Sequence, residues 1–233
     1  TGNLGSRIDV GDKEDGISVL AAGFNNMARE LESSMKKVSD TLEVIRMSAM
    51  KHEDKETAGI AESLSRQMEY LIGSYSCMVP LEKEIGNIRE YFHIMQIQYE
   101  DRIQLEVSVD EDVMDAIIVK MSLQPIVENA VQHGLMPKTG DGTVRIEAHR
   151  KDEILEITVM DDGVGMTEEK LQELRELDQD ETGVQTGSGE THGGIRNVRD
   201  RICRNFGSGY GLEIMSTEGT GTVAVYCLPL ILE

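Results

Sequence analysis

The 233-residue sequence predicts an α+β protein in which helices come first and a mixed sheet packed on helices follows. Two observations support this prediction. Apolar residues recur at helical spacing through the first hundred residues, and they alternate with polar residues in four short stretches after Asp101. Helical candidates lie between those stretches. Strands and helices segregated in this order indicate an α/β sandwich with helices on one face of the sheet.

The first helix is predicted from a heptad seam that starts just after Asp15. Its apolar residues follow one another in steps of three and four, with one polar position at Ser34, which is typical of a coiled coil. The seam consists of Ile17, Leu20, Phe24, Met27, Leu31 and Val38. The glycine-rich, charged residues 1–15 are expected to be a connector.

Two further amphipathic helices are expected before residue 101, each with one buried face. The apolar residues of the first are Ile60, Leu64, Met68 and Leu71. The second follows Pro80, and its apolar residues are Ile85, Ile88, Phe92, Met95 and Tyr99. We therefore expect three parts: a linker helix over residues 1–38, paired helices over 39–100, and a separate domain over 101–233.

Within the last part, the alternation of polar and apolar residues predicts strands over residues 102–110, 143–150, 153–161 and 220–230. Helices are expected over residues 122–134, 167–177 and 194–205. Residues 178–193 have almost no apolar content. A polar segment of that length is either disordered or a lid over a site.

Charge and cysteine content argue against several functions. Acidic residues outnumber basic ones 43 to 23, giving a formal net charge of -20, so no nucleic-acid surface is expected, because phosphate binding needs clustered cations. Cys77, Cys203 and Cys227 form no CxxC pair, which argues against a disulfide framework and a zinc site, and all three are interpreted as packing residues. No apolar run approaches the ~18 residues that a membrane span needs, so the sequence itself is expected to be soluble.

Two polar motifs interrupt apolar elements. In LQPIVENAVQHG, Glu128 and Asn129 are adjacent, and His133 follows one turn later; these groups could hold a hard cation or simply face water. In VMDDGVGM, Asp161 ends a predicted strand and Gly163 and Gly165 follow. That carboxylate could accept a hydrogen bond from an exocyclic amino group, or the motif could be an ordinary glycine turn.

Two further motifs contain glycines next to predicted elements. In THGGIRNVRDRI, Gly193 and Gly194 run into a helix with Ile195 on its inner face, where backbone N–H groups could meet a phosphate; the alternative is a flexible loop before a surface helix. The arginines of this motif reverse the acidic charge locally. They are Arg196, Arg199, Arg201 and Arg204. In GTGTVAV, Thr222 could support Asp161, or the glycines could form only a hairpin turn.

In this order, the four motifs resemble the asparagine and glycine boxes of the GHKL ATPases, the family of gyrase, Hsp90, histidine kinases and MutL. Over roughly residues 41–233 the sequence is similar to sensor histidine kinases of the LytS/YesM type. The resemblance implies a GHKL (Bergerat) ATP-binding sandwich over residues 101–233, dimerisation helices over 39–100, and ATP and Mg²⁺ as ligands. Residues 1–38 resemble the second half of a HAMP linker, in which Phe24-Asn25-Asn26-Met27 matches the usual FNxM helix.

The resemblance also implies site residues. Asn129 would ligate Mg²⁺, Glu128 would assist proton removal from the acceptor imidazole, and Asp161 would bind the adenine amino group. The other nucleotide contacts would be His133, Gly163, Gly165, Met166, Gly193, Gly194, Ile195, Arg196 and Thr222. The third box departs from the usual GxGL pattern, because His192 stands where its first glycine is expected.

The implied activity is transfer of the γ-phosphoryl group of Mg-ATP to a histidine and then to a response regulator. The implied protein is a homodimer that is tethered to the cytoplasmic side of the bacterial membrane in its full-length form. Two alternatives stay open: a GHKL regulatory or ATPase module without kinase activity, and a dimeric scaffold that binds no nucleotide.

The acceptor histidine expected in this type of kinase is absent from the printed sequence. It would lie in a Pro-His-Phe-x-Tyr-Asn run before Thr41-Leu42, but Val38-Ser39-Asp40 stand there instead. His52, followed by Glu53, superficially imitates the acceptor of other kinases. It lies in a charged stretch that is predicted to be a loop between helices, and the other four histidines lack acceptor context.

Overall fold

The computed structural model describes residues 16–72, 76–179 and 190–232. The chain divides into two compact units, Thr1–Cys77 and Met78–Glu233. The predicted connector over residues 1–15 lies outside the described residues.

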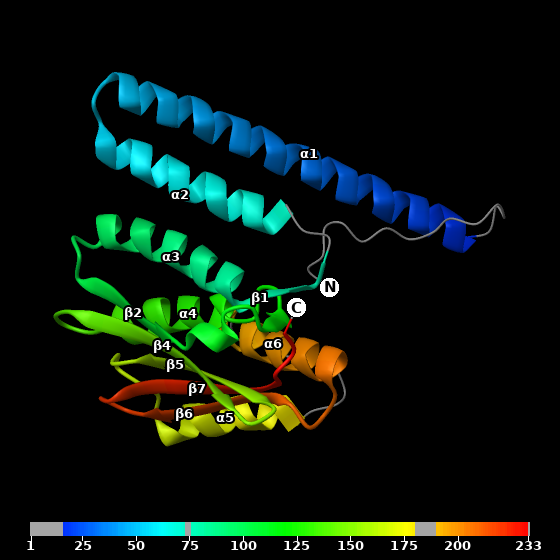
Figure 1. Cartoon of the computed structure of the whole chain (residues 1–233), viewed down its shortest axis with the longest axis vertical. Coiled ribbons are helices and arrows are strands. Elements are labelled where there is room, and N and C mark those ends of the chain that lie inside the picture. Colours follow the sequence, from blue (N-terminus) through cyan, green and yellow to red (C-terminus); the bar gives the residue numbers. More distant parts are fainter. Residues whose placement is uncertain (1–15, 73–75, 180–189, 233) are drawn as a thin grey trace. The chain divides into compact units, whose positions relative to one another are not determined.

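The first unit is a helical hairpin of α1 (Gly16–Lys51) and α2 (Lys55–Ile72), which lie side by side in Figure 1. The backbone N–H of Thr57 donates to Asp54 Oδ1 at 3.0 Å and so caps the start of α2. His52 lies in the turn between the helices, as predicted, and its Nδ1 is 2.8 Å from the carbonyl oxygen of Ser48.

The predicted heptad seam of α1 is exposed in this single chain. Phe24, Met27, Leu31 and Val38 are between 40 % and 63 % exposed, whereas the side chains of Ile17 and Leu20 lie outside the described set. The less exposed stripe of α1 is offset from the seam by one residue along the chain. It consists of Asn25, Ala28, Glu32, Met35, Ser39, Leu42, Arg46 and Ala49. The apolar seam therefore lies on a different face of α1 from the less exposed stripe.

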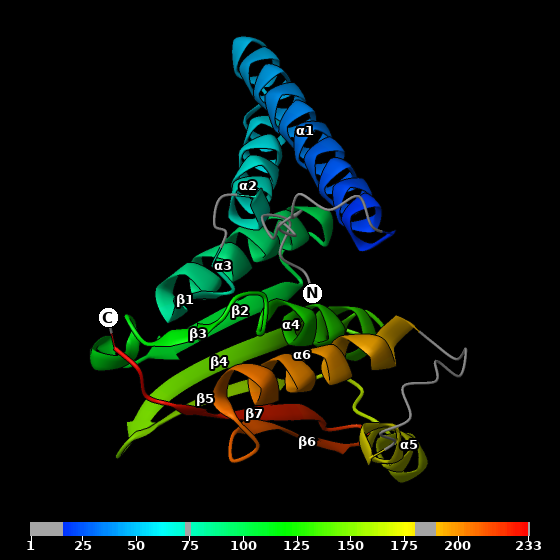
Figure 2. The same ribbon diagram turned by 90° about the vertical axis from the view of Figure 1, so that its right-hand side faces the viewer.

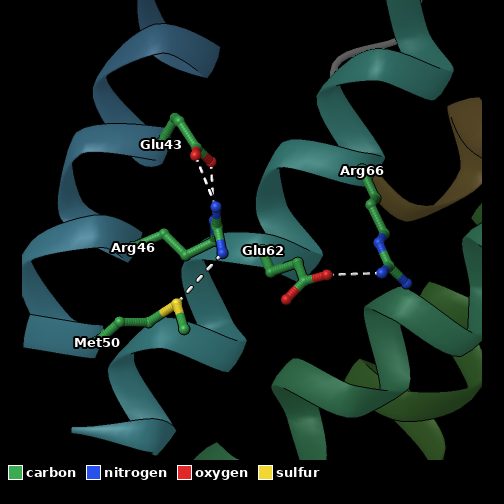
Figure 3. Close-up of polar contacts among 5 residues, drawn as sticks. All are labelled: Glu43, Arg46, Met50, Glu62 and Arg66. Carbon is green, nitrogen blue, oxygen red and sulfur yellow. Dashed lines mark hydrogen bonds and ion pairs between the residues drawn. The ribbon is translucent and has the colours of Figure 1, made fainter. Parts of the chain in front are cut away.

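The polar contacts drawn in Figure 3 run along each helix of the hairpin. Arg46 donates through Nε and Nη2 to the Glu43 carboxylate at 2.8 and 2.6 Å, and its Nη1 is 3.3 Å from the sulfur of Met50. On α2, Arg66 forms an ion pair with Glu62 at 2.6 Å. Exposed ion pairs of this kind add little stability, so apolar packing must account for most of the hairpin's stability.

The second unit contains a five-stranded mixed sheet in the order β2-β4-β5-β7-β6. Its strands are β2 (Ile103–Val109), β4 (Gly142–Lys151), β5 (Ile154–Asp161), β6 (Gly211–Thr217) and β7 (Gly221–Pro229). β2 and β4 are parallel, and the other pairs are antiparallel. A separate antiparallel pair joins β1 (Met78–Pro80) to β3 (Ile117–Val119).

Strand register places the buried side chains on one face of the sheet. Ile146, Val159, Ala224 and Ile214 form one row across four strands, and all are buried. The α-helices of this unit are α3 (Leu81–Gln98), α4 (Gln124–Asn129), α5 (Glu168–Gln179) and α6 (Glu190–Phe206). A short 3₁₀ turn, η1, spans Glu111–Val113, and a π-helical segment, η2 (Ala130–Leu135), follows α4.

Figure 2 shows α4 and α6 lying over one face of the sheet, and residues of both helices join the buried core. The predicted mixed sandwich with helices on one face is therefore confirmed. The four predicted strands correspond to β2, β4, β5 and β7 within two residues at each end. Strands β1, β3 and β6 were not predicted, because two of them have only three residues and β6 has only Leu212 and Ile214 buried.

Three predictions need correction. The helix expected over 122–134 is a six-residue α-helix followed by a π-helical segment. Part of the expected loop at 178–193 is helical, because α5 extends to Gln179 and α6 starts at Glu190; residues 180–189 lie outside the described part. The three cysteines do not pack in the core, since all are exposed. The contact division assigns α3 to the second unit, and the three-part organisation expected from the sequence stays a prediction.

Candidate functional site

A pocket opens between α4, η2, α5, α6 and the sheet. The space inside it, its open mouth included, is about 700 Å³. Seven predicted site residues line it: Asn129, His133, Asp161, Gly165, Met166, Ile195 and Thr222. The remaining lining residues are Ile126, Ala130, Gly134, Val159, Lys170, Leu174, Ile214 and Ala224. Residues from both halves of the second unit thus converge on one largely apolar cavity with a few polar groups, the usual character of a small-molecule site.

Asp161 is the last residue of β5 and places a half-buried carboxylate in the pocket wall. Its Oδ1 accepts the backbone N–H of Gly163 at 2.9 Å. Burial raises the pKa of Asp161 from 3.8 to about 6, against the lowering effect of backbone hydrogen bonds from Gly163 and Thr222. At neutral pH this carboxylate is ionised and can accept a hydrogen bond from a ligand.

Close backbone packing behind Asp161 requires glycine. A Cβ on Gly163 would lie 2.3 Å from the carbonyl carbon of Gly134. Gly221 has a φ of +122°, and a Cβ there would lie 2.0 Å from the carbonyl oxygen of Asp161. The glycine boxes therefore let η2, the turn after β5 and the start of β7 meet around one carboxylate.

The π-helical segment η2 presents the asparagine-box residues to the pocket. Asn129 ends α4 and His133 lies within η2, and both line the cavity. The carbonyl oxygen of Gly134 accepts the N–H of Val164 at 3.0 Å, which joins η2 to the glycine turn. Asn129 Nδ2 is buried and has no hydrogen-bond partner among the described residues. An unpaired buried amide facing a cavity is a position where a ligand can supply the missing partner.

A short network ties the edge of the pocket to the β6–β7 hairpin. The N–H of Met166 donates to Ser216 Oγ at 2.9 Å, and Ser216 Oγ donates to the carbonyl oxygen of Gly221 at 3.0 Å. Ser216 Oγ is also 2.9 Å from Thr222 Oγ1. Thr222 pairs with Asp161 in the β5–β7 register, which places it beside that carboxylate as the sequence suggested.

The loop that leads into α4 is held from three directions, which keeps the asparagine box in place. Buried Glu84 accepts the N–H groups of Met121 and Leu123 at 2.5 and 3.2 Å. Arg201 donates to the carbonyl oxygens of residues 120 and 121, and Tyr226 Oη donates to that of residue 122 at 2.8 Å. Met121 has a φ of +57°, a left-handed conformation that costs a non-glycine residue roughly 1 to 2 kcal/mol.

Five predicted residues do not line the pocket. Glu128 is half-buried, and its Oε1 accepts Gln124 Nε2 at 2.9 Å. Gly163 supports the turn behind the carboxylate. Gly193 lies in the first turn of α6. Gly194 follows it and packs near α4, since a Cβ there would lie 3.9 Å from Pro125 Cβ. Arg196 is half-buried farther along α6.

Eight residues that line the pocket were not predicted from the sequence. Six of them, among them Val159 and Ile214, are apolar and look like core positions in the sequence. Gly134 could have been found, because it directly follows His133 in the same motif. Lys170 could also have been found, since Lys170 and Leu174 share the i, i+4 spacing of one face of the helix predicted over residues 167–177.

A mixed sheet covered by helices on one face, with a strand-terminal carboxylate, a glycine turn and an asparagine box around one pocket, defines the GHKL class of nucleotide-binding domain. Residues 114–232 match the family model described as "Histidine kinase-, DNA gyrase B-, and HSP90-like ATPase". The chain belongs to this family, and membership implies ATP as its nucleotide. Residues 38–103 match the model described as "Histidine kinase".

Two similar proteins are sensor kinases. The chain is 31 % identical over 190 residues to the sensor histidine kinase YesM of Bacillus subtilis. This match covers 82 % of this chain and 30 % of YesM. It is also 31 % identical over 172 residues to the sensor protein kinase HptS of Staphylococcus aureus. That match covers 73 % of this chain and 32 % of HptS. The chain thus spans about a third of the length of these relatives. The matches confirm the resemblance to LytS/YesM-type sensor histidine kinases, and the HAMP-like segment stays a prediction.

Among solved structures, the histidine kinase domain of a blue-light-activated kinase from Erythrobacter litoralis is 17 % identical, with a TM-score of 0.48. The match covers 88 % of this chain and 94 % of that one. Within residues 16–72, 76–179 and 190–232, we find no helix with the length and apolar content of a membrane span.

Proposed function

We propose that the chain is the ATP-binding kinase part of a two-component sensor histidine kinase. It binds Mg-ATP and transfers the γ-phosphoryl group to a histidine, from which a response regulator takes it. The observation that supports this most directly is the half-buried carboxylate of Asp161 in an apolar pocket behind a glycine turn. A carboxylate in that setting accepts from the adenine amino group and discriminates against guanine, which presents a carbonyl there.

The pocket suits the parts of Mg-ATP in order. Apolar residues such as Met166, Ile195 and Ile214 would contact the adenine ring beside Asp161. Asn129 would hold Mg²⁺ through its amide oxygen, and its unpaired nitrogen would donate to a phosphate oxygen. Mg²⁺ held there would supply positive charge to neutralise the phosphates.

The triphosphate is assigned to the start of α6. Gly193 and Gly194 lie in its first turns, next to α4 through Pro125, and Arg196 follows. Backbone N–H groups at a helix N-terminus and a nearby guanidinium both favour a polyanion. His133 and Gly165 would complete the nucleotide contacts from η2 and the glycine turn.

Glu128 is proposed to assist proton removal from the acceptor imidazole. It lies next to Asn129 on α4 but outside the adenine pocket, so its carboxylate is not occupied by the base. A group placed in this way affects the rate of transfer rather than nucleotide affinity.

The protein is proposed to act as a homodimer, with the exposed α1 seam pairing with a second copy. Phe24, Met27, Leu31 and Val38 keep heptad spacing on a face that α2 leaves exposed. An apolar heptad stripe, here with one polar position at Ser34, is best covered by an identical helix in parallel register. The full-length protein is proposed to be anchored in the membrane before this helix, with the kinase part on the cytoplasmic side.

The 233-residue chain, as its sequence stands, is proposed to bind nucleotide without phosphorylating itself on histidine. α1 runs without interruption through Val38-Ser39-Asp40-Thr41, where the acceptor run would stand. His52 lies in the turn at the end of the hairpin. Misplaced reactants lose most of the roughly 7 to 11 kcal/mol that good positioning supplies. The missing acceptor also favours the second candidate, a GHKL regulatory or ATPase module.

Two experiments test the proposal. Titration with ATP, GTP and ADP should show Mg-dependent binding of the adenine nucleotides, and equal affinity for ATP and GTP would refute the adenine assignment. Labelling with [γ-³²P]ATP should then compare the printed chain, His52→Ala, and a chain with a Pro-His-Phe-x-Tyr-Asn run inserted before Thr41. Labelling only after insertion supports the kinase. ATP hydrolysis without labelling in any chain supports the ATPase module.

A further inference from the structure

Glu128 is held by a buried side chain on its own helix. Gln124, one turn earlier on α4, is 4 % exposed, and its Nε2 donates to Glu128 Oε1 at 2.9 Å. A hydrogen bond from a neutral amide to a carboxylate is about twice as strong as one between neutral groups. It engages one carboxylate oxygen and leaves the other available to take up a proton.

A second buried amide donates to the oxygen of Gln124 and so favours the orientation in which its nitrogen faces Glu128. Asn87 on α3 is 8 % exposed, and its Nδ2 donates to Gln124 Oε1 at 3.2 Å. Because a carboxamide carries its acceptor and its donor at opposite ends, occupying the oxygen of Gln124 turns the nitrogen toward Glu128. The reversed orientation would place the Gln124 oxygen against a carboxylate, and the Asn87 oxygen, which is buried without a partner among the described residues, would have to accept from Gln124 in place of the present bond.

The same face of α3 carries a second group near this carboxylate. Tyr91 lies one turn after Asn87, and burial, together with the charge of Glu128, raises the pKa of its hydroxyl. Tyr91 therefore stays neutral in the range where the kinase works. Neither Asn87 nor Gln124 carries a charge, so the pair orients Glu128 without adding a competing ion.

We propose that Gln124, oriented by Asn87, is a positioning residue that fixes the Glu128 carboxylate for proton transfer. The inference rests on the proposed function, which assigns that role to Glu128, and it adds two residues outside the nucleotide pocket that control the rate. Gln124 acts through Glu128 and is not among the residues that line the pocket.

Three variants separate positioning from mere support of the fold. Gln124→Met keeps the volume and removes both hydrogen bonds. Gln124→Glu keeps the acceptor for Asn87 but sets a second carboxylate against Glu128, and Asn87→Leu removes only the orienting bond. Glu128→Gln provides the reference for loss of the acid–base group.

The assay mixes the 233-residue chain with a synthetic peptide that contains the Pro-His-Phe-x-Tyr-Asn run. It measures phosphoryl transfer from [γ-³²P]ATP to that peptide. Gln124→Met should lower kcat about tenfold or more, but by no more than the roughly 10² to 10⁴ that general acid–base catalysis supplies, and should leave the Kd of Mg-ATP within about twofold. Gln124→Glu should lower kcat further, and Asn87→Leu less.

A double-mutant cycle gives the decisive comparison. If Gln124 acts through Glu128, adding Gln124→Met to Glu128→Gln causes no further loss of kcat. Losses that multiply, or a parallel loss of ATP affinity, would overturn the proposal and leave Gln124 a structural residue. Normal transfer by Glu128→Gln would instead refute the proposed role of Glu128.

A second measurement does not depend on transfer. In NMR spectra, the side-chain NH₂ of Gln124 should be shifted downfield by its bond to the carboxylate and protected from exchange. Glu128→Ala and Asn87→Leu should each remove that shift. An exposed, unshifted Gln124 amide in the unchanged chain would overturn the proposal even if no phosphoryl transfer were detectable.

Discussion

Replacing Asp161 with asparagine should make the free protein more stable while abolishing nucleotide binding. The fold raises the pKa of Asp161 from 3.8 to about 6, mainly through burial. The folded state therefore binds the proton more tightly than the unfolded state does. The contribution of Asp161 to the free energy of unfolding is therefore greatest below pH 3.8, falls as pH rises toward 6, and changes little above that. Asparagine cannot ionise, so the variant escapes this loss.

The expected magnitude follows from the pKa shift. About two pKa units at roughly 1.4 kcal/mol each correspond to about 3 kcal/mol between the two forms at pH 8. About half of that difference should accumulate between pH 5 and pH 8. For a unit of this size, about 3 kcal/mol corresponds to a rise in Tm of roughly 6 to 12 °C. Any hydrogen-bond mismatch of the new amide adds an offset that does not depend on pH.

Urea unfolding of the wild type and Asp161→Asn at pH 5 and pH 8, each with and without Mg-ATP, measures both effects. The stability difference should grow with pH in favour of the variant, and Mg-ATP should stabilise the wild type only. A difference that stays constant from pH 5 to pH 8 would refute the burial argument. A full Mg-ATP shift in the variant would refute the assignment of Asp161 to adenine.

Three further predictions concern packing, a buried hydrogen bond and assembly. Gly163→Ala should destabilise the second unit by about 1 to 3 kcal/mol in urea unfolding, whereas Gly86→Ala, in a helix with open space around it, should stabilise it by about 0.5 to 1 kcal/mol. Tyr226→Phe should cost about 1 to 3 kcal/mol, because it leaves a buried carbonyl without its donor, and an unchanged unfolding midpoint would contradict this. Leu31→Glu should convert a dimer to a monomer in light scattering, because it places a charge in the α1 seam. Ser33→Glu, which lies off the seam, should leave the dimer intact. A monomer for the wild type as well as both variants would rule out the seam as an interface.

Periodicity predicted the elements that bury one face over several turns or residues. Alternation at residues 153–161 places Leu155, Ile157 and Val159 on one side, and all three are buried in β5. The three-residue strands β1 and β3 give no such signal. The π-helical segment also escaped prediction, because one additional residue per turn near Gly134 hardly disturbs an already apolar pattern.

Side-chain partners far apart in the chain could not be predicted from spacing. Asn87 and Gln124 are separated by 37 positions, and only the packing of α3 on α4 brings them together. Cys227 could have been placed correctly, because it stands between buried Tyr226 and Leu228 on an alternating strand and must therefore face outward.

The loop before α4 also constrains when the site can form during synthesis. Tyr226 secures this loop across 104 positions of the chain, and Arg201 does so across 80. A nascent chain therefore holds the loop through Glu84 alone at first, and the anchors from Arg201 and Tyr226 are added only when those residues have left the ribosome. A product truncated before β7 lacks Thr222 and Ala224 of the pocket wall as well as the Tyr226 anchor, so it should not bind nucleotide.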